Sequence, residues 1–207
     1  MKKKITILFM ATFVAVMVFA QENSYLRTNK NKVMMNVYTS IGYATGLGDM
    51  NDFLSYAPDF AGNFDDMQML QGGIGWSMDY FFANNWAYYI GIGVSRGNDW
   101  AAEDNLHVVM NNWISWVGAE YFFYHNNKLT LSANLCLGME EIDFDYGAYN
   151  GRWTNYTLPV GITLWYERIG FNINYSPSIF RTEPDETPTD MPKMSSNNID
   201  LTLRLAF

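Results

Sequence analysis

Apolar and polar residues alternate one by one along much of the chain, and this alternation limits the fold more than any other feature. The segment 199–207, for example, has Ile, Leu, Leu, Leu and Phe at its odd positions and Asp, Thr, Arg and Ala at its even positions. A period of two residues indicates β-strands that have one apolar and one polar face. Eight segments follow this pattern: residues 33–43, 70–82, 86–94, 112–123, 129–140, 156–166, 169–176 and 199–207. The sequence therefore predicts an all-β fold.

The connections between these segments alternate in length. Three are short, near residues 83–85, 125–127 and 167–168, whereas four are long, over about residues 47–68, 97–106, 143–152 and 181–197. Short turns at one end and long loops at the other are typical of an outer-membrane β-barrel. We therefore predict an eight-stranded antiparallel up-and-down transmembrane β-barrel. Its even strand number would place both termini on the short-turn, periplasmic side.

The N-terminal segment has the pattern of an export signal. Three lysines at positions 2–4 precede an apolar stretch that ends at Val18-Phe19-Ala20, a small-residue cleavage pattern. A membrane anchor is the alternative, but the apolar stretch is short for a helix that would need about 20 residues to span. We predict three segments: a cleaved signal peptide over residues 1–20, a periplasmic segment over 21–31 and the barrel over 32–207.

The composition of the two strand faces favours a bilayer over water. The polar faces consist mostly of Gly, Ser, Asn and Thr, which suits a packed lumen better than a wet surface. A soluble lipocalin-like barrel would need charge on its outer face, and a β-sandwich would give no reason for the alternating connections. Aromatic residues should gather at the membrane interfaces. Those expected near the short turns are Tyr80, Phe82, Trp86, Tyr121, Phe123, Tyr166, Phe171 and Phe207, and those near the long loops are Tyr43, Trp113, Trp153 and Tyr156.

Charge and cysteine content exclude other classes. The formal net charge of -8 argues against a nucleic-acid partner. A single cysteine, Cys136, excludes an internal disulfide framework and any multi-cysteine metal site.

The export signal, the eight strands and the final Leu-Thr-Leu-Arg-Leu-Ala-Phe resemble the small outer-membrane β-barrel superfamily of the OmpA membrane domain and OmpX. The resemblance implies an outer-membrane location in a Gram-negative bacterium, and the Ala20-Gln21 junction is similar to exports of Bacteroidota. It also implies that the terminal apolar residues form the signal read by the barrel-assembly machinery. The residues that match this signal are Leu201, Leu203, Leu205 and Phe207.

An eight-stranded barrel is just wide enough for side chains to fill. The expected inward residues include several bulky ones, so a general diffusion pore is not predicted; these are Met34, Tyr38, Phe81, Tyr89, Trp116, Phe122 and Trp165. We expect a structural or adhesion-type role through four acidic and aromatic extracellular loops, with an extracellular or envelope protein as partner. The alternatives are a subunit of a larger envelope complex or a narrow channel for small solutes.

An enzyme that modifies lipid A is the main rival. Such barrels, like the lipid A deacylase and palmitoyltransferase families, need a His-assisted nucleophile near the outer rim. His125 lies in a short turn on the wrong side, and His107 has no serine beside it in a recognisable motif. The acidic loops could bridge divalent ions weakly, but they lack a complete calcium motif. We therefore predict no catalytic residues, no cofactor and no metal site.

The remaining predictions concern two groups of charged residues. Asp79, Glu120 and Arg204 have inward parity near the short turns, so Arg204 should bridge one or both carboxylates across the lumen. At the outer ends of the strands, basic side chains can pair with lipopolysaccharide phosphates. Arg96, Arg152 and Arg181 are the candidates for this contact.

Overall fold

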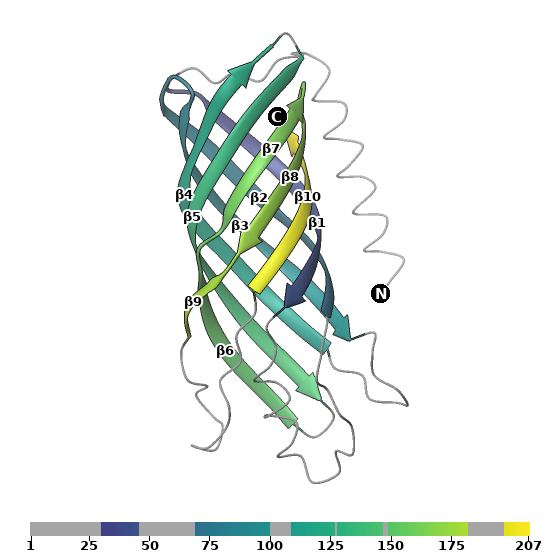
Figure 1. The fold of residues 1–207 in the computed structure, drawn as a ribbon. Helices are drawn as coiled ribbons and strands as arrows, with labels where there is room; N and C mark the ends of the chain where they lie inside the picture. The colour runs from purple at the N-terminus through teal and green to yellow at the C-terminus, as the bar shows by residue number, and fades with distance from the viewer. Residues whose placement is uncertain (1–29, 46–68, 100–108, 127, 147–148, 182–196) are drawn as a thin grey trace.

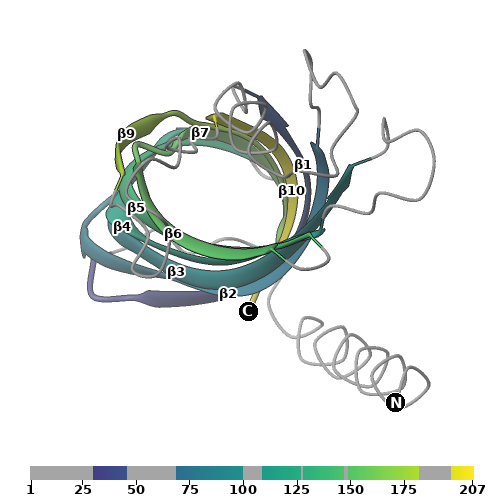
Figure 2. The ribbon, with the colours of Figure 1, turned by 90° about the horizontal axis from the view of Figure 1, so that it is seen from below.

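The computed structural model describes residues 30–45, 69–99, 109–126, 128–146, 149–181 and 197–207. Their strands form a closed antiparallel barrel (Figures 1 and 2). The strands are β1 (Val33–Thr45), β2 (Met69–Ala83), β3 (Trp86–Asp99), β4 (Val109–His125), β5 (Leu129–Tyr146), β6 (Tyr149–Thr157), β7 (Val160–Tyr166), β8 (Ile169–Ser176), β9 (Ser178–Arg181) and β10 (Asn197–Ala206). Each predicted segment lies in a strand of this barrel.

Ten segments make eight barrel strands because two strands are interrupted by proline. β6 and β7 are one strand broken at Leu158-Pro159, and β8 and β9 are one strand broken at Pro177. Proline has no N–H to donate to a neighbouring strand, so each proline interrupts the ladder at its own position. The backbone stays connected across the breaks, because Leu158 N–H donates to the Pro177 carbonyl and Cys136 N–H donates to the Pro159 carbonyl. The predicted fold, an eight-stranded antiparallel barrel, is confirmed.

Strand order follows the chain, as expected for an up-and-down barrel. The sheet runs β4-β3-β2-β1-β10-β8-β7-β5-β6-β9, and an additional β4–β5 pairing closes the ring. The seam between the two ends of the chain is a long ladder in which β1 pairs with β10 from Asn36↔Ala206 to Thr45↔Asn197. Viewed along the axis, the strands form a closed ring (Figure 2).

The short turns are tight because single residues adopt left-handed backbone conformations. Asn85 between β2 and β3 has φ of 68°, and Glu167 between β7 and β8 has φ of 55°. Only two residues separate the paired positions Ala83↔Trp86 and Tyr166↔Ile169, which is the commonest length for a β-hairpin. These turns lie at one end of the barrel, at the top of Figure 1.

One predicted long loop is wrong. We expected a loop over about residues 143–152, but β5 and β6 stay paired from Asp143↔Arg152 to Tyr146↔Tyr149. The Asp, Gly and Asn residues of this stretch resemble a loop in composition, yet they continue the ladder and leave only residues 147–148 between the strands. The other predicted long connections lie outside the described residues, apart from the strand ends that flank them.

Candidate functional site

The lumen is filled by inward-facing side chains, so it is the first place to look for a site. The bulky residues predicted to point inward do so: Met34, Tyr38, Phe81, Tyr89, Phe122 and Trp165 are buried, and the Trp116 ring lies 5.4 Å from the Tyr38 ring and 5.8 Å from the Tyr89 ring. Polar side chains occupy the space between these rings. They form two groups at different levels of the bore.

The first group lies toward the short turns and centres on Arg204. Its Nη2 atom lies 3.1 Å from Asp79 Oδ2, and its Nη1 atom lies 2.9 Å from Glu120 Oε2. The structure thus brings together the three residues that the sequence placed in the lumen, from β2, β4 and β10. All three are buried, with 1% of the Arg204 side chain and 0% of the two carboxylate side chains exposed.

Neutral donors and aromatic rings complete this group, which we call the inner plug (Asp79, Glu120 and Arg204 with the side chains around them). Asn36 donates to Asp79, and Ser132 donates to Glu120. The guanidinium carbon of Arg204 lies 4.6 Å from the ring centroids of both Tyr89 and Trp165. A cation between two desolvated aromatic rings gains cation–π attraction from each of them. The arginine is therefore held by charge and by ring contacts.

An apolar cluster lies next to the ion pairs and shares Trp165 with the inner plug. Its members are Met34, Phe81, Ala87, Phe122, Trp165 and Ala206. The Phe81 and Phe122 rings are 5.2 Å apart at their centroids. Close-packed side chains of this size leave no water-filled path. The lumen is thus closed at the end of the short turns.

The second group, the outer belt, centres on Glu140 of β5 and was not predicted. Glu140 accepts hydrogen bonds from the side-chain amides of Asn112, Asn155 and Asn198 at 2.8–3.5 Å. The Asn112 amide also reaches Gln71, whose Oε1 accepts from Ser95. The belt links side chains of β2, β3, β4, β5, β6 and β10 across the bore. Parity assigns each of these residues to the lumen, but the sequence does not show that they lie at the same level.

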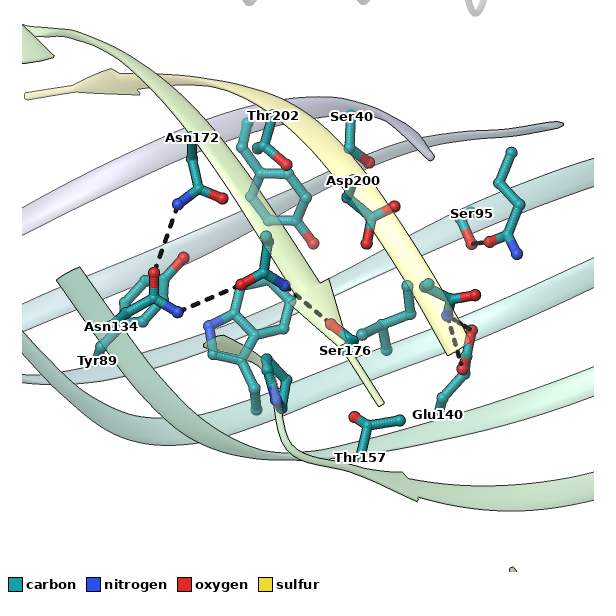
Figure 3. A pocket seen from close by; sticks show the side chains of 17 residues that line it. Ser40, Tyr89, Ser95, Asn134, Glu140, Thr157, Asn172, Ser176, Asp200 and Thr202 are labelled. Atoms are coloured by element: carbon teal, nitrogen blue, oxygen red, sulfur yellow. Dashed lines mark hydrogen bonds between the residues drawn. The ribbon is translucent and has the colours of Figure 1, made fainter. Parts of the chain in front are cut away.

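Between the two groups lies a cavity of about 80 Å³ (Figure 3). Its polar lining includes Ser40, Asn134, Asn172, Asp200 and Thr202, while Ile114, Trp116 and Pro159 supply apolar surface. The amides of Asn134 and Asn172 bond to each other and to their neighbours. The volume is enough for several water molecules and for no large solute.

The outer face of the barrel is apolar over its whole circumference. Trp113 and Ile173 expose 63% and 62% of their surface, and similar exposure recurs on every barrel strand. Most of the aromatic residues expected near the short turns lie on this face; Tyr80, Trp86, Tyr121, Phe123, Tyr166, Phe171 and Phe207 are exposed. At the other end Trp113 and Tyr156 are exposed, whereas the side chain of Trp153 lies outside the described residues. In water such a surface would be an aggregation hazard, whereas in a bilayer it is required.

The arginines proposed for lipopolysaccharide contact occupy the end of the barrel away from the short turns. Arg96 and Arg152 lie in one cross-strand row, Arg96↔Asn111↔Asp143↔Arg152. Arg96 is exposed, and Arg152 is exposed but bonded to Asp143 at 2.6 Å. Arg181 ends β9, and its side chain lies outside the described residues.

The apolar residues of the predicted assembly signal line the outer face of β10. Leu201 and Leu203 are exposed, and Leu205 is half-buried. The Phe207 backbone exchanges two hydrogen bonds with Met35, and its ring lies edge-on to Trp76 at 6.3 Å. This residue therefore helps to hold β10 against β1.

Among the described residues there is no group of three His, Cys, Asp or Glu side chains that could hold a metal ion. Within the same ranges, no helix is long and apolar enough to cross a membrane. Of the two histidines, His125 contacts Thr130 and Asn85 beside the short turns. His107 lies outside the described residues.

An apolar exterior, a polar and plugged lumen, and eight antiparallel strands that close on themselves define a small β-barrel of the outer-membrane type. No protein-family model and no curated protein matches the sequence. Solved structures do match. The chain is similar in fold to Neisserial surface protein A (NspA), with 12% sequence identity, a TM-score of 0.51, and coverage of 84% of this chain and 97% of that chain. A looser likeness, with 10% identity, a TM-score of 0.46 and coverage of 84% and 98%, is to Ail, the attachment invasion locus protein of Yersinia pestis.

Proposed function

We propose that this protein is an integral outer-membrane barrel with a closed lumen, which acts through its outer end in a structural or adhesion-type role. The observation that supports this most is the inverted distribution of polarity, with apolar residues exposed on all sides and charged residues buried in the bore. Hydrocarbon contact stabilises such a surface, since every backbone group of a closed barrel is paired internally. The plugged bore argues against a channel for solutes.

The orientation is part of the proposal. The tight turns at Asn84-Asn85 and Glu167-Arg168 would face the periplasm, because outer-membrane barrels keep their short turns there. Both termini would then be periplasmic, after removal of residues 1–20 as a signal peptide, with residues 21–31 as a periplasmic segment and 32–207 as the barrel.

An epitope scan would test this orientation. A tag inserted within residues 182–196 should bind antibody on intact cells. The same tag inserted between Glu167 and Arg168 should bind only after the cells are permeabilised. The opposite result at the two sites would overturn the orientation.

We also propose that the lipid-facing rim contacts lipopolysaccharide through Arg96, Arg152 and Arg181. The row that contains Arg96 and Arg152 is polar and lies on the outer face, toward the end away from the short turns, where headgroup phosphates would meet guanidinium groups. Changing all three to Met should reduce lipopolysaccharide co-purification. Arg168→Met, at the opposite end, is the matched control and should have no effect.

Assembly is the third component of the proposal. Leu201, Leu203, Leu205 and Phe207 would form the signal read by the barrel-assembly machinery, since they occupy the outer face of the strand that closes the ring. Phe207→Ser should lower the amount of folded barrel in the membrane. Phe171→Ser, the same change at an exposed position on β8, tests whether the effect is specific to the terminal position.

A non-enzymatic role through the outer end predicts a partner or a structural phenotype. Affinity purification from native membranes after mild cross-linking is the decisive experiment. Recovery of an extracellular protein or glycan ligand supports the adhesion-type role. A stoichiometric envelope protein would instead make the barrel a subunit of a larger complex, and altered lipid A in an overexpressing strain would contradict the non-enzymatic role.

A further inference from the structure

The cavity between the two polar groups contains a carboxylate that neither group uses. Asp200 of β10 lines the cavity, and no hydrogen bond or ion pair joins it to any other described residue. It lies over Gly42 of β1, where a Cβ atom would overlap the carboxylate. The glycine thus makes room for Asp200 to lean into the bore. Asp200 is half-buried, and an ionised carboxylate partly removed from water is stabilised when an opposite charge reaches it.

The described residues of the lining supply no positive charge. Among them are the carboxylates of Asp200 and Glu140 but no Lys, Arg or His. Arg204 lies at the other level, already shared between Asp79 and Glu120. A counter-charge for Asp200 would therefore come from outside this set of side chains.

Neutral oxygen atoms surround the same space. Ser40 and Thr202 are paired across the β1–β10 ladder beside Asp200, and Figure 3 shows the three side chains on one side of the cavity. Asn198, two residues earlier on β10, is only 5% exposed and also lines the cavity, and its Oδ1 atom has no hydrogen-bond partner in the described part of the chain. A buried carbonyl oxygen without a protein donor is available to a ligand in the cavity.

A carboxylate, a free amide carbonyl and hydroxyl groups are the oxygen ligands that hard cations prefer. We propose that the lumen cavity binds one monovalent alkali cation, of sodium or potassium type, between Asp200 and these neutral oxygens. One free carboxylate balances one positive charge. Calcium takes six to eight oxygens and usually several carboxylates, and Glu140, the other acid of the lining, already accepts hydrogen bonds from three amides.

Thermal unfolding of the purified full-length barrel in detergent tests the proposal through linkage, because a ligand that binds only the folded state raises its stability. The unfolding midpoint is measured in sodium, potassium and choline chloride at equal ionic strength. We expect the wild type to unfold at higher temperature in sodium or potassium than in choline, which is too large for the cavity. The difference should grow with the logarithm of the alkali concentration.

Asp200→Asn is the informative variant. Its unfolding midpoint should be the same in alkali chloride and in choline chloride. In choline it should be at least as stable as the wild type, because the substitution removes a charge that choline cannot reach. Asp143→Asn changes an exposed carboxylate on the outer face and should keep the full difference. Equal midpoints in choline and alkali for the wild type, or the same difference in Asp200→Asn, would overturn the proposal.

Crystals of the wild type in rubidium or thallium salts give a test that does not depend on the variants. An anomalous peak within coordination distance of the Asp200 carboxylate supports the site. A lumen without such a peak, at concentrations that saturate the thermal effect, would contradict it. A peak only at exposed carboxylates such as Asp143 would contradict it as well.

Discussion

The two ends of the lumen bury carboxylates by different means. In the inner plug, Asp79 and Glu120 share the guanidinium of Arg204, which two aromatic rings also contact. In the outer belt, Glu140 accepts hydrogen bonds from a circle of asparagine amides. An ion pair fixes a few groups in one geometry. Amide side chains, by contrast, can exchange hydrogen-bond partners with little change in the charge around the carboxylate. The inner end is therefore the more rigid closure and the outer end the more adaptable one.

The strongest test of this difference is Arg204→Met. The change leaves two carboxylates buried without their partner, so we expect the free energy of unfolding to fall by about 3–5 kcal/mol. Urea unfolding in lipid vesicles measures it, with Arg96→Met as the control because that side chain is exposed. Equal losses for the two variants would show that the inner plug adds no stability.

A combined variant separates the effect of the ion pairs on stability from the effect of the volume that their side chains fill. Replacing Arg204 by Met together with Asp79 and Glu120 by Leu should recover most of the loss, since apolar groups of similar size often replace a buried ion network without cost. A combined variant as unstable as Arg204→Met alone would mean that lost packing, and not unpaired charge, causes most of the loss in unfolding free energy.

At the outer belt we expect a smaller effect. Glu140→Gln keeps the shape and one acceptor but removes the charge that strengthens the amide hydrogen bonds, so the loss should be about 1–3 kcal/mol. The same unfolding experiment measures it. A loss as large as that of Arg204→Met would remove the distinction between the two ends.

The smallest effect belongs to the outer face. Arg152 is exposed and forms an ion pair with Asp143, of whose side chain 38% is exposed. Surface ion pairs contribute from zero to about 1 kcal/mol, so Arg152→Met should change stability by no more than that. Its effect should instead appear in lipopolysaccharide co-purification.

The sequence predicted the inner plug but not the outer belt, and the reason is geometric. Parity shows which side chains face the bore, and distance from a short turn shows their level. Asp79, Glu120 and Arg204 each lie three residues from the short-turn end of their predicted segments, so their levels could be counted. Glu140 and its amide partners lie far from the short turns, and their level depends on stagger between strands that no single sequence reveals.

The erroneous third loop has a similar origin. Residues 143–152 have the Asp, Gly and Asn content of a loop, and only their cross-strand partners show that they form a ladder. Pro159 lies inside the predicted segment 156–166, whose continuous alternation concealed the interruption, whereas the predicted segment 169–176 ends just before Pro177. Local composition predicts where the propensity to form a strand is low. Pairing with the neighbouring strands decides whether the strand ends there.

The position of Arg204 on β10 has a consequence for how the barrel forms. The seam joins residue 36 to residue 206, so its contacts span the greatest separation along the described chain. Contacts of such separation form slowly and depend on the rest of the chain being in place. Because the same strand carries Arg204 into the bore, ring closure and insertion of the charged group are one event. Before that event, Asp79 and Glu120 lack the guanidinium partner that they have in the closed barrel.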